Sequence, residues 1–218
     1  MNDVSKPTPE FLFFDMGNVL ITFEMDGICE RMAQVAGVAP EVIHTHFFSA
    51  SGMLWEAESG RITSHQLYEE FCRRTGTRPD EDELNAAACS TFAVNVPILP
   101  VLIALKRAGW QLGILSNICE AHWKWCLEHY RFLTDLFDCQ LASYELGCSK
   151  PAAEIFELAA DHAGRCLGVM PSPERIVFTD DIPRNVVGAE QAGWDAEPFT
   201  NVESLVAALR RRGVPMAL

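Results

Sequence analysis

The chain has 218 residues, 49% of them apolar, and a formal net charge of −13. This length can hold one good-sized domain, or one core domain with a small insertion, around a substantial hydrophobic core. The net negative charge argues against a nucleic-acid partner, because nucleic-acid binding needs clustered Lys and Arg. An anionic substrate would need positively charged groups at its binding site.

We expect neither a targeting segment nor disulfide bonds in this chain. Residues 1–10 are polar and contain two prolines, so we expect neither a signal peptide nor an anchor there. No window approaches the roughly 20 apolar residues that span a bilayer, and we expect no membrane partner. The eight cysteines are scattered and form no C-x-x-C pair. We therefore interpret them as reduced, mostly structural residues of a cytoplasmic protein without a zinc site.

The first predicted element is the run Phe11-Leu12-Phe13-Phe14, which reads as a strand buried on both faces, as in parallel sheets. It stops at Asp15, and Gly17-Asn18 then favours a tight turn with positive φ. A carboxylate at the end of a buried strand is costly unless a cation or hydrogen bonds compensate it. Taken alone, Asp15 could equally well cap the loop or belong to a site.

The stretch that follows is predicted to be helical. Residues 21–27 look like a short flap, and from there to about Asn95 the sequence contains no strand-like run. Thr63-Ser64-His65-Gln66 resembles a capping box, and the acids at 80–83 suit the start of another helix. We expect residues 22–95 to form a small inserted helical domain.

Strands return in the second half of the chain. Apolar runs at 110–115, near 140–144, at 175–179 and at 194–199 alternate with helical patterns. This alternation implies βαβ units, and hence an α/β fold with a doubly wound parallel sheet. We expect residues 1–21 and 96–218 to form this Rossmann-like core.

Polar residues follow four of the predicted strands. Ligands of such sheets bind at the carboxyl ends of the strands, so these residues should meet at one edge. Each has an ordinary explanation alone, as a cap, a solvated lysine or a turn, but the set as a whole favours a functional site. Its members are Asp15, Ser116-Asn117, Lys150 and Asp180-Asp181.

The chemistry of this set points to phosphoryl transfer. Three carboxylates in one pocket repel one another unless a hard cation lies among them, and oxygen ligands suit Mg²⁺. Ser116, backbone N–H groups and Lys150 could hold phosphate oxygens. The aligned carboxylate of Asp15 could then attack phosphorus and form an acyl phosphate.

Four segments carry a specific resemblance: FFDMGNVL, GILSN, CSKP and VFTDDIPRNVVGAEQAG. They resemble the four motifs of the haloacid dehalogenase superfamily of hydrolases, and the helical insertion falls where many members carry a cap. The resemblance implies a nucleophilic Asp15, catalytic Ser116 and Lys150, and Mg²⁺ held by Asp15, the Gly17 carbonyl, Asp181 and its neighbour Asp180. It also implies substrate contacts from Ser116, Asn117, Lys150, Gly17 and Asn18, with Asn185 as a further motif-four polar residue.

One position departs from the family. Most of its phosphatases carry a general acid–base Asp two residues after the nucleophile, and this chain has Gly17 there. The pattern is nonetheless similar to a subset resembling glucose-1-phosphate phosphatase and the N-terminal domain of epoxide hydrolase. Either the substrate has an acidic leaving group, such as an anomeric hydroxyl, or another side chain replaces the acid. The candidates are Glu24, Asp26, Glu56 and Glu58.

The leading hypothesis is a Mg²⁺-dependent phosphatase that hydrolyses a small phosphorylated metabolite, with a sugar phosphate as one example, through an aspartyl-phosphate intermediate. Two alternatives stay open: a metal-independent 2-haloacid dehalogenase, and a weakly active or non-catalytic binding protein, which Gly17 would explain. We expect a monomer or homodimer. Two further residues are noted: Arg61 is expected on the solvated surface rather than at the substrate, and His122 is a candidate neighbour of the site.

Overall fold

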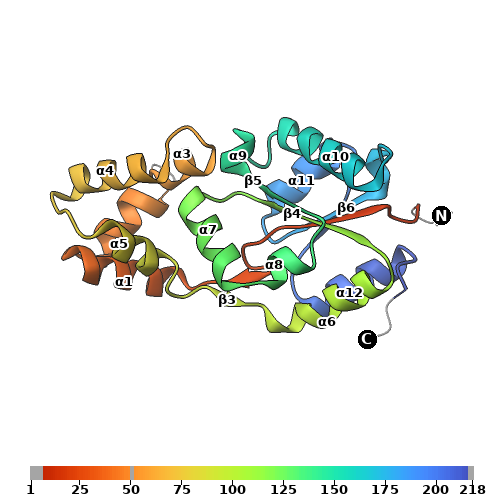
Figure 1. Ribbon diagram of the computed structural model, residues 1–218, viewed down its shortest axis with the longest axis horizontal. Helices are drawn as coiled ribbons and strands as arrows, with labels where there is room; N and C mark the ends of the chain where they lie inside the picture. The colour runs from red at the N-terminus through yellow and green to blue at the C-terminus, as the bar shows by residue number, and fades with distance from the viewer. Residues whose placement is uncertain (1–6, 50–51, 216–218) are drawn as a thin grey trace.

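The computed structural model describes residues 7–49 and 52–215. Its centre is a five-stranded parallel sheet in the order β5-β4-β1-β6-β7 (Figure 1). The strands are β1 (Phe11–Phe14), β4 (Gln111–Ser116), β5 (Cys139–Ala142), β6 (Ile176–Asp180) and β7 (Asp195–Pro198). In register, Phe14 lies opposite Ile114 on one side and Thr179 on the other, so β1, β4 and β6 end close together.

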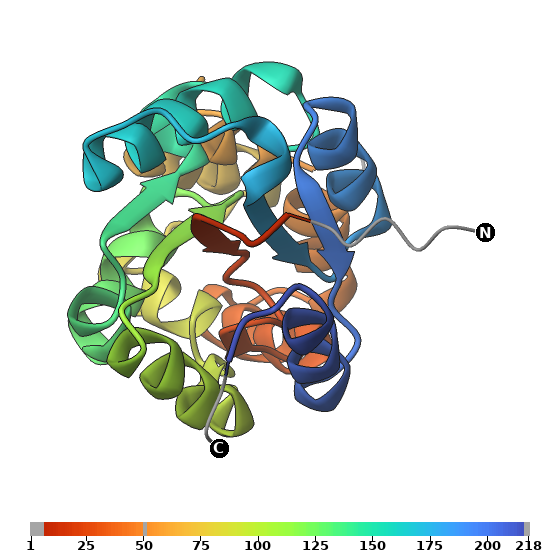
Figure 2. The same cartoon turned by 90° about the vertical axis from the view of Figure 1, so that its right-hand side faces the viewer.

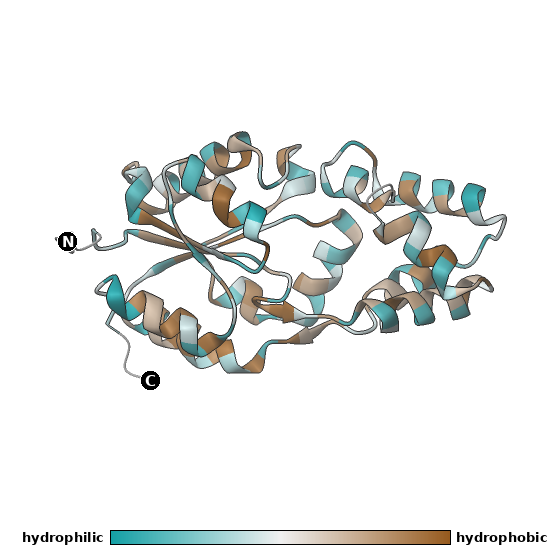
Figure 3. Cartoon of the chain, turned by 180° about the vertical axis from the view of Figure 1, so that it is seen from behind, coloured by the Kyte–Doolittle hydropathy of each residue, from teal (hydrophilic) through white to brown (hydrophobic). Residues whose placement is uncertain are grey.

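Helices cover both faces of the sheet (Figure 2). The reason can be seen in β1, whose apolar side chains point alternately to the two faces. Phe11 and Phe13 belong to a buried cluster with residues of α10 (Ala153–Leu167) and α11 (Pro183–Gln191). Leu12 and Phe14 belong to the opposite cluster, with residues of α6 (Leu99–Arg107), α7 (Glu120–His129) and α12 (Val202–Arg211). Figure 3 shows the resulting apolar centre. The predicted doubly wound α/β fold is confirmed.

A separate group of helices lies beyond the carboxyl ends of the strands (Figure 1). These helices share a buried cluster of their own, distinct from the two that flank the sheet. Thr63 and Gln66 form the predicted capping box at the start of α4. The group comprises α1 (Met25–Ala36), α2 (Pro40–Ile43), a π-helical turn (His44–Phe48), α3 (Leu54–Glu58), α4 (Ser64–Thr75) and α5 (Glu81–Ala88).

We propose that this group is the inserted domain expected at 22–95, and that 1–21 and 96–218 form the core. Residues 50–51 of the inserted domain lie outside the described residues. So do residues 1–6 and 216–218 of the core, and residues 1–6 make up most of the polar start of the chain. In the described part, no helix is long and apolar enough to cross a membrane.

The structure corrects some element boundaries. The region 22–95 is not free of strands, because β2 (Ile21–Thr22) pairs antiparallel with β3 (Ala93–Val94) where the chain enters and leaves the helical group. Tyr144 lies not in a strand but in the short helix α9 (Ser143–Leu146), which follows β5 directly. The remaining short helices are α8 (Phe132–Asp135) and the 3₁₀ turns Val96–Ile98 and Pro173–Arg175.

Candidate active site

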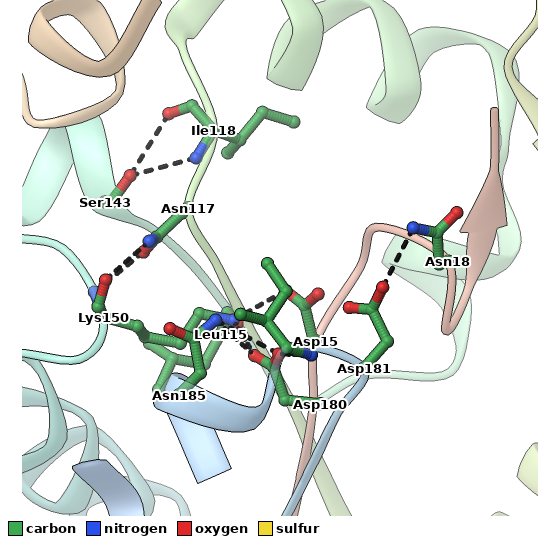
Figure 4. Close-up of polar contacts among 11 residues, drawn as sticks. Asp15, Asn18, Leu115, Asn117, Ile118, Ser143, Lys150, Asp180, Asp181 and Asn185 are labelled. Carbon is green, nitrogen blue, oxygen red and sulfur yellow. Dashed lines mark hydrogen bonds and ion pairs between the residues drawn. The ribbon is translucent and has the colours of Figure 1, made fainter. Parts of the chain in front are cut away.

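Lys150 joins two acids from different strand ends (Figure 4). Its Nζ donates to Asp15 Oδ1 at 2.7 Å and to Asp180 Oδ2 at 2.6 Å. A third bond runs to the carbonyl oxygen of Leu115 at 2.7 Å. All three ammonium protons therefore have acceptors within the protein, and the lysine organises the site before any ligand arrives.

These charges are buried, and the Lys150 ammonium stabilises both carboxylates. Burial raises the pKa of Asp15, the Lys150 ammonium lowers it and the Asp180 carboxylate raises it again, and the net direction is upward. Burial lowers the pKa of Lys150, but the carboxylates of Asp15 and Asp180 outweigh that effect and the net direction is upward. With an ammonium 2.7 Å away, we assign Asp15 as an ionised carboxylate and Lys150 as a cation.

Asp180 is fully buried, and its oxygens are surrounded by donors. Besides Lys150, the backbone N–H of Ile182 donates to Oδ1 at 2.8 Å, and Asn185 Nδ2 lies 3.1 Å from both oxygens. A carboxylate has about four lone-pair sites, and four contacts occupy them here. This arrangement suits a residue that fixes Lys150 and Asn185 better than one that directly binds a metal ion.

Asp181 lies at the same edge but faces the turn after β1. Asn18 Nδ2 donates to its Oδ2 at 2.9 Å, and Asn18 adopts the left-handed conformation, with φ of 55°. The positive φ expected at Gly17-Asn18 therefore falls on the asparagine. One carboxylate oxygen from each of Asp15, Asp180 and Asp181 lies within 4.8 Å of the other two.

This donor set fits a hard divalent cation. It consists of carboxylate oxygens, which Mg²⁺ prefers. Asn185 adds a second observation, because its Oδ1 is buried and lacks a hydrogen-bond partner among the described residues. An orphaned oxygen beside clustered carboxylates matches a site whose occupant supplies positive charge or donors.

Ser116 ends β4 and Asn117 follows it at the same edge, but their surroundings differ. Ser116 is buried and lines the cavity described below. Asn117 lines it too, yet its amide is engaged with the backbone of Lys150: Nδ2 donates to the Lys150 carbonyl at 2.9 Å, and Oδ1 accepts from the Lys150 N–H at 2.8 Å. The substrate contact expected of Asn117 is thus limited by a structural role.

A cavity of about 230 Å³ lies between the strand ends and the helical group. Its floor is polar and holds Asp15, Gly17, Asn18, Lys150, Asp181 and Asn185. Its opposite wall is mostly apolar and comes largely from the helical group and the segments entering it, with Phe23, Met25, Ile28, Phe48, Leu54 and Phe92. The cavity therefore offers an anionic group a charged end and the rest of a small molecule an apolar surround.

Of the two further residues noted in the sequence, one lines this cavity and the other does not. His122 lines it, and burial lowers the pKa of its imidazole to about 4, so the ring is neutral at pH 7. Arg61 does not line it; the side chain is exposed and its guanidinium lies 4.5 Å from the centre of the Trp55 ring. Arg61 is thus on the surface, as expected.

Sequence reasoning missed Arg184. It follows Pro183 at the start of α11 and lines the cavity. The sequence did contain a signal for it. An arginine three residues after the acid pair, in a chain of net charge −13, can supply the positive charge that an anionic substrate needs near the site.

Together, the parallel sheet, the lysine-bridged acids at its carboxyl edge and the covered cavity define an α/β enzyme with a charged site between a sheet and a helical layer. Comparison with known families makes the class specific. Residues 10–193 match the family described as haloacid dehalogenase-like hydrolase, and the chain belongs to that family of hydrolases.

Individual relatives cover most of the chain. Pyrimidine 5'-nucleotidase YjjG of Escherichia coli (strain K12) is 28% identical over 194 residues, which are 84% of this chain and 83% of the nucleotidase. D-ribitol-5-phosphate phosphatase of Bacteroides thetaiotaomicron is 23% identical over 190 residues, 84% of this chain and 88% of that protein. The HAD family enzyme bt-2542 of the same species, solved in complex with magnesium and inorganic phosphate, aligns with a TM-score of 0.77 and 25% identity over 90% of this chain and 98% of its own.

Proposed function

We propose that this protein is a Mg²⁺-dependent phosphomonoesterase that hydrolyses a small phosphorylated metabolite through an aspartyl-phosphate intermediate. The observation that carries the proposal is the junction of Asp15, Lys150 and Asp180, with an oxygen of Asp181 within 4.8 Å of the other acids. A carboxylate nucleophile, a buried cation and oxygen ligands for a hard metal are the parts that phosphoryl transfer requires.

In this proposal Asp15 attacks phosphorus. Lys150 keeps its carboxylate ionised and oriented while compensating the charge of Asp180. The hydroxyl of Ser116 and the turn at Gly17-Asn18 line the cavity and would bind the phosphate oxygens. All three Lys150 protons already have acceptors, so we assign Lys150 mainly to this electrostatic role. To bind a phosphate oxygen, Lys150 would give up one of these three hydrogen bonds.

Mg²⁺ would be held by Asp15, Asp181 and the carbonyl oxygen of Gly17. The bound ion would neutralise phosphate charge and so reduce its repulsion from the Asp15 carboxylate. The oxygens of Asp180 already have four contacts. Asp180 would therefore hold Lys150 and Asn185 beside the metal ligands rather than bind the ion itself. The unpaired Asn185 Oδ1 would accept a hydrogen bond at its edge.

The relatives support the proposed substrate class. One is a nucleotidase, another a sugar-alcohol phosphate phosphatase, and a third holds magnesium and inorganic phosphate. The cavity of about 230 Å³ suits a small molecule, with its phosphate at the lysine end and its organic part against the apolar wall. A sugar phosphate is one such molecule.

The two alternative readings have less support. A metal-independent haloacid dehalogenase has no need for a third carboxylate beside Asp15 and Asp180, yet Asp181 is there. A non-catalytic binding protein has no need for a buried carboxylate held 2.7 Å from a lysine at the floor of a cavity. Gly17 remains the argument for weak activity.

A panel of phosphate esters, assayed with Mg²⁺ and after chelation, tests the proposal. We expect turnover that requires both the metal and Asp15, and that is lost in Asp15→Asn. Activity that survives in Asp15→Asn would refute the proposed mechanism. Halide release from a 2-chloroacid in the presence of chelator would instead support the dehalogenase.

A further inference from the structure

Gly17 leaves open the place where most family phosphatases carry an acid. A Cβ built at Gly17 would lie 3.4 Å from Cε1 of Phe23 and 3.9 Å from Oδ2 of Asp15. Both are ordinary contacts, so the backbone would accept an acidic side chain beside Asp15. The chain has none there, and a poor leaving group would need its proton from another group.

Glu58 is the one replacement candidate that reaches the cavity. Of the four acids considered from the sequence, Glu24, Asp26 and Glu56 are absent from the lining, whereas Glu58 contributes to it. It is the last residue of α3 and is half-buried. Within the part of the chain that the structure describes, its carboxyl group forms no hydrogen bond or ion pair, so it is available to a ligand.

Backbone contacts hold Glu58 over the site. Ser143 Oγ donates to the Glu58 carbonyl and accepts from the N–H of Ile118 at 3.0 Å, which ties α3 to the loop after β4. Two residues later, Gly60 adopts a φ of 70°, and a Cβ there would lie 2.4 Å from the Tyr144 carbonyl oxygen. Only glycine permits this approach between the helical group and α9. The position of Glu58 therefore does not depend on its own side chain.

The surroundings also adjust its acidity. Burial raises the pKa of Glu58 to about 7, and the Asp15 carboxylate acts in the same direction. Lys150 and Arg184 lower the pKa without cancelling that effect. A carboxyl group with a pKa near neutrality can both give and take a proton during one turnover. The charged and titratable groups sharing its cavity are Asp15 after β1, His122 on α7, Lys150, and Asp181 and Arg184 around the start of α11.

We infer, resting on the proposed phosphatase function, that Glu58 is the general acid and base of the reaction and substitutes for the side chain that Gly17 lacks. In-line attack by Asp15 places the leaving oxygen on the side of phosphorus away from the sheet, where the helical group supplies Glu58. The acid thus comes from the element that covers the substrate.

Protons and bonds balance over two steps. In the first, Asp15 bonds to phosphorus, the bond from phosphorus to the leaving oxygen breaks, and Glu58 gives its proton to that oxygen. In the second, the Glu58 carboxylate takes a proton from water as the water oxygen bonds to phosphorus. The bond from Asp15 to phosphorus breaks, inorganic phosphate leaves, and both carboxyl groups return to their starting states.

The test measures hydrolysis of aryl and alkyl phosphates of graded leaving-group basicity by wild type, Glu58→Gln, Gly17→Asp/Glu58→Gln and the control Glu56→Gln. Glu56 lies on the same helix but outside the cavity. We expect Glu58→Gln to lose about 10²–10⁴-fold in kcat/KM, which reports the first step, on alkyl phosphates and under about tenfold on p-nitrophenyl phosphate, whose leaving group needs no proton. Because the second step also uses Glu58, kcat should fall on both kinds of substrate. The double variant should recover alkyl phosphate hydrolysis, and Glu56→Gln should match wild type.

The pH profile gives a second readout. For wild type on an alkyl phosphate, kcat/KM should fall above about pH 7, and Glu58→Gln should lack that limb. If Glu58→Gln does not fold, Glu58→Asp replaces it and should show a smaller loss with the same dependence on leaving group. Wild-type activity that needs Asp15, combined with Glu58 variants equal to wild type on alkyl phosphates, overturns this inference alone. Absence of Asp15-dependent hydrolysis overturns the proposed function together with it.

Discussion

The side chain of Asn117 pairs with the backbone of Lys150 in both directions, through bonds of 2.9 and 2.8 Å. Asn117 directly follows β4, and it thereby fixes the loop that carries Lys150, 33 positions later in the chain. This pairing fixes the backbone from which the Lys150 side chain reaches Asp15, Asp180 and the Leu115 carbonyl (Figure 4). The placement of the buried ammonium group thus depends on an amide that forms no charge contact itself.

Asn117→Ala should weaken this arrangement. Two backbone groups of Lys150 lose their partners, and we expect a loss of about 1–3 kcal/mol in the free energy of unfolding. Because Lys150 then positions Asp15 less well, kcat should also fall roughly tenfold to a hundredfold. Urea unfolding and steady-state kinetics measure the two effects. Asn95→Ala is the control, because its amide also binds a distant backbone carbonyl, that of Val19, without lining the cavity; an equal kcat loss there would contradict the assignment.

Lys150→Met should be far more damaging than loss of a surface lysine. It leaves the carboxylates of Asp15 and Asp180 buried without their cation, which typically costs about 3–5 kcal/mol. Lys124→Met removes an exposed, solvent-screened partner of Glu120 and should change the free energy of unfolding far less. Chemical denaturation of both variants tests the difference. Similar stabilities would show that the buried pair contributes little.

Much of the fold was accessible from the sequence because hydrophobic periodicity determines it. The run Phe11–Phe14 predicted a strand buried on both faces, and its two faces indeed pack in two different clusters. The pairing of β2 with β3 was not accessible, since two-residue strands carry no periodic signal. The grouping of polar strand ends followed from the general rule for parallel sheets.

Other features of the site required coordinates. That Asn117 would bind the backbone of Lys150, rather than leave its amide for a ligand, depends on a contact between residues 33 positions apart. The choice of Glu58 among four acids depends on how α3 packs on α9, and that packing is set by Ser143 and Gly60. Such contacts are tertiary, and single-sequence patterns do not report them.

Mg²⁺ should stabilise the folded chain through Asp181. At a concentration of Mg²⁺ a hundredfold above the dissociation constant, binding adds about 2.7 kcal/mol to the free energy of unfolding. Asp181→Asn should weaken Mg²⁺ binding by about tenfold or more, whereas Asp161→Asn, an exposed acid on α10, should not change it. Calorimetric titration with MgCl₂ and thermal unfolding supply the readouts. Binding unchanged in Asp181→Asn would place the metal elsewhere.

His122 should make the protein sensitive to acid. Burial lowers the pKa of its imidazole from 6.5 to about 4, so between these values the unfolded chain binds a proton that the folded chain does not. Stability should therefore fall as pH drops from about 6.5 toward 4, by about 1.4 kcal/mol for each unit of pKa difference. His122→Gln should remove this part of the acid sensitivity, and His44→Gln, at an exposed position, should not. Unfolding free energies at pH 7, 5.5 and 4.5 compare them.

Arg184 should contribute to substrate binding more than to the chemical step. It lines the cavity at the start of α11, yet it forms no bond to Asp15, Lys150 or Asp180 in the described structure. Its charge would therefore attract an anionic substrate without taking part in bond breaking. Removing such an interaction equally from the ground state and the transition state raises KM and leaves kcat nearly unchanged.

We accordingly expect Arg184→Ala to raise KM for a phosphate ester several-fold, by about 1 kcal/mol or slightly more, with kcat within about twofold of wild type. The increase should shrink as salt is added, because the guanidinium is exposed and its field is screened. Arg107→Ala provides the matched control: it removes the same charge from the end of α6, before β4 and so at the opposite edge of the sheet. If both variants raise KM equally, the effect reflects the net charge of −13 rather than the site. A fall in kcat for Arg184→Ala alone would instead assign the arginine to the transition state.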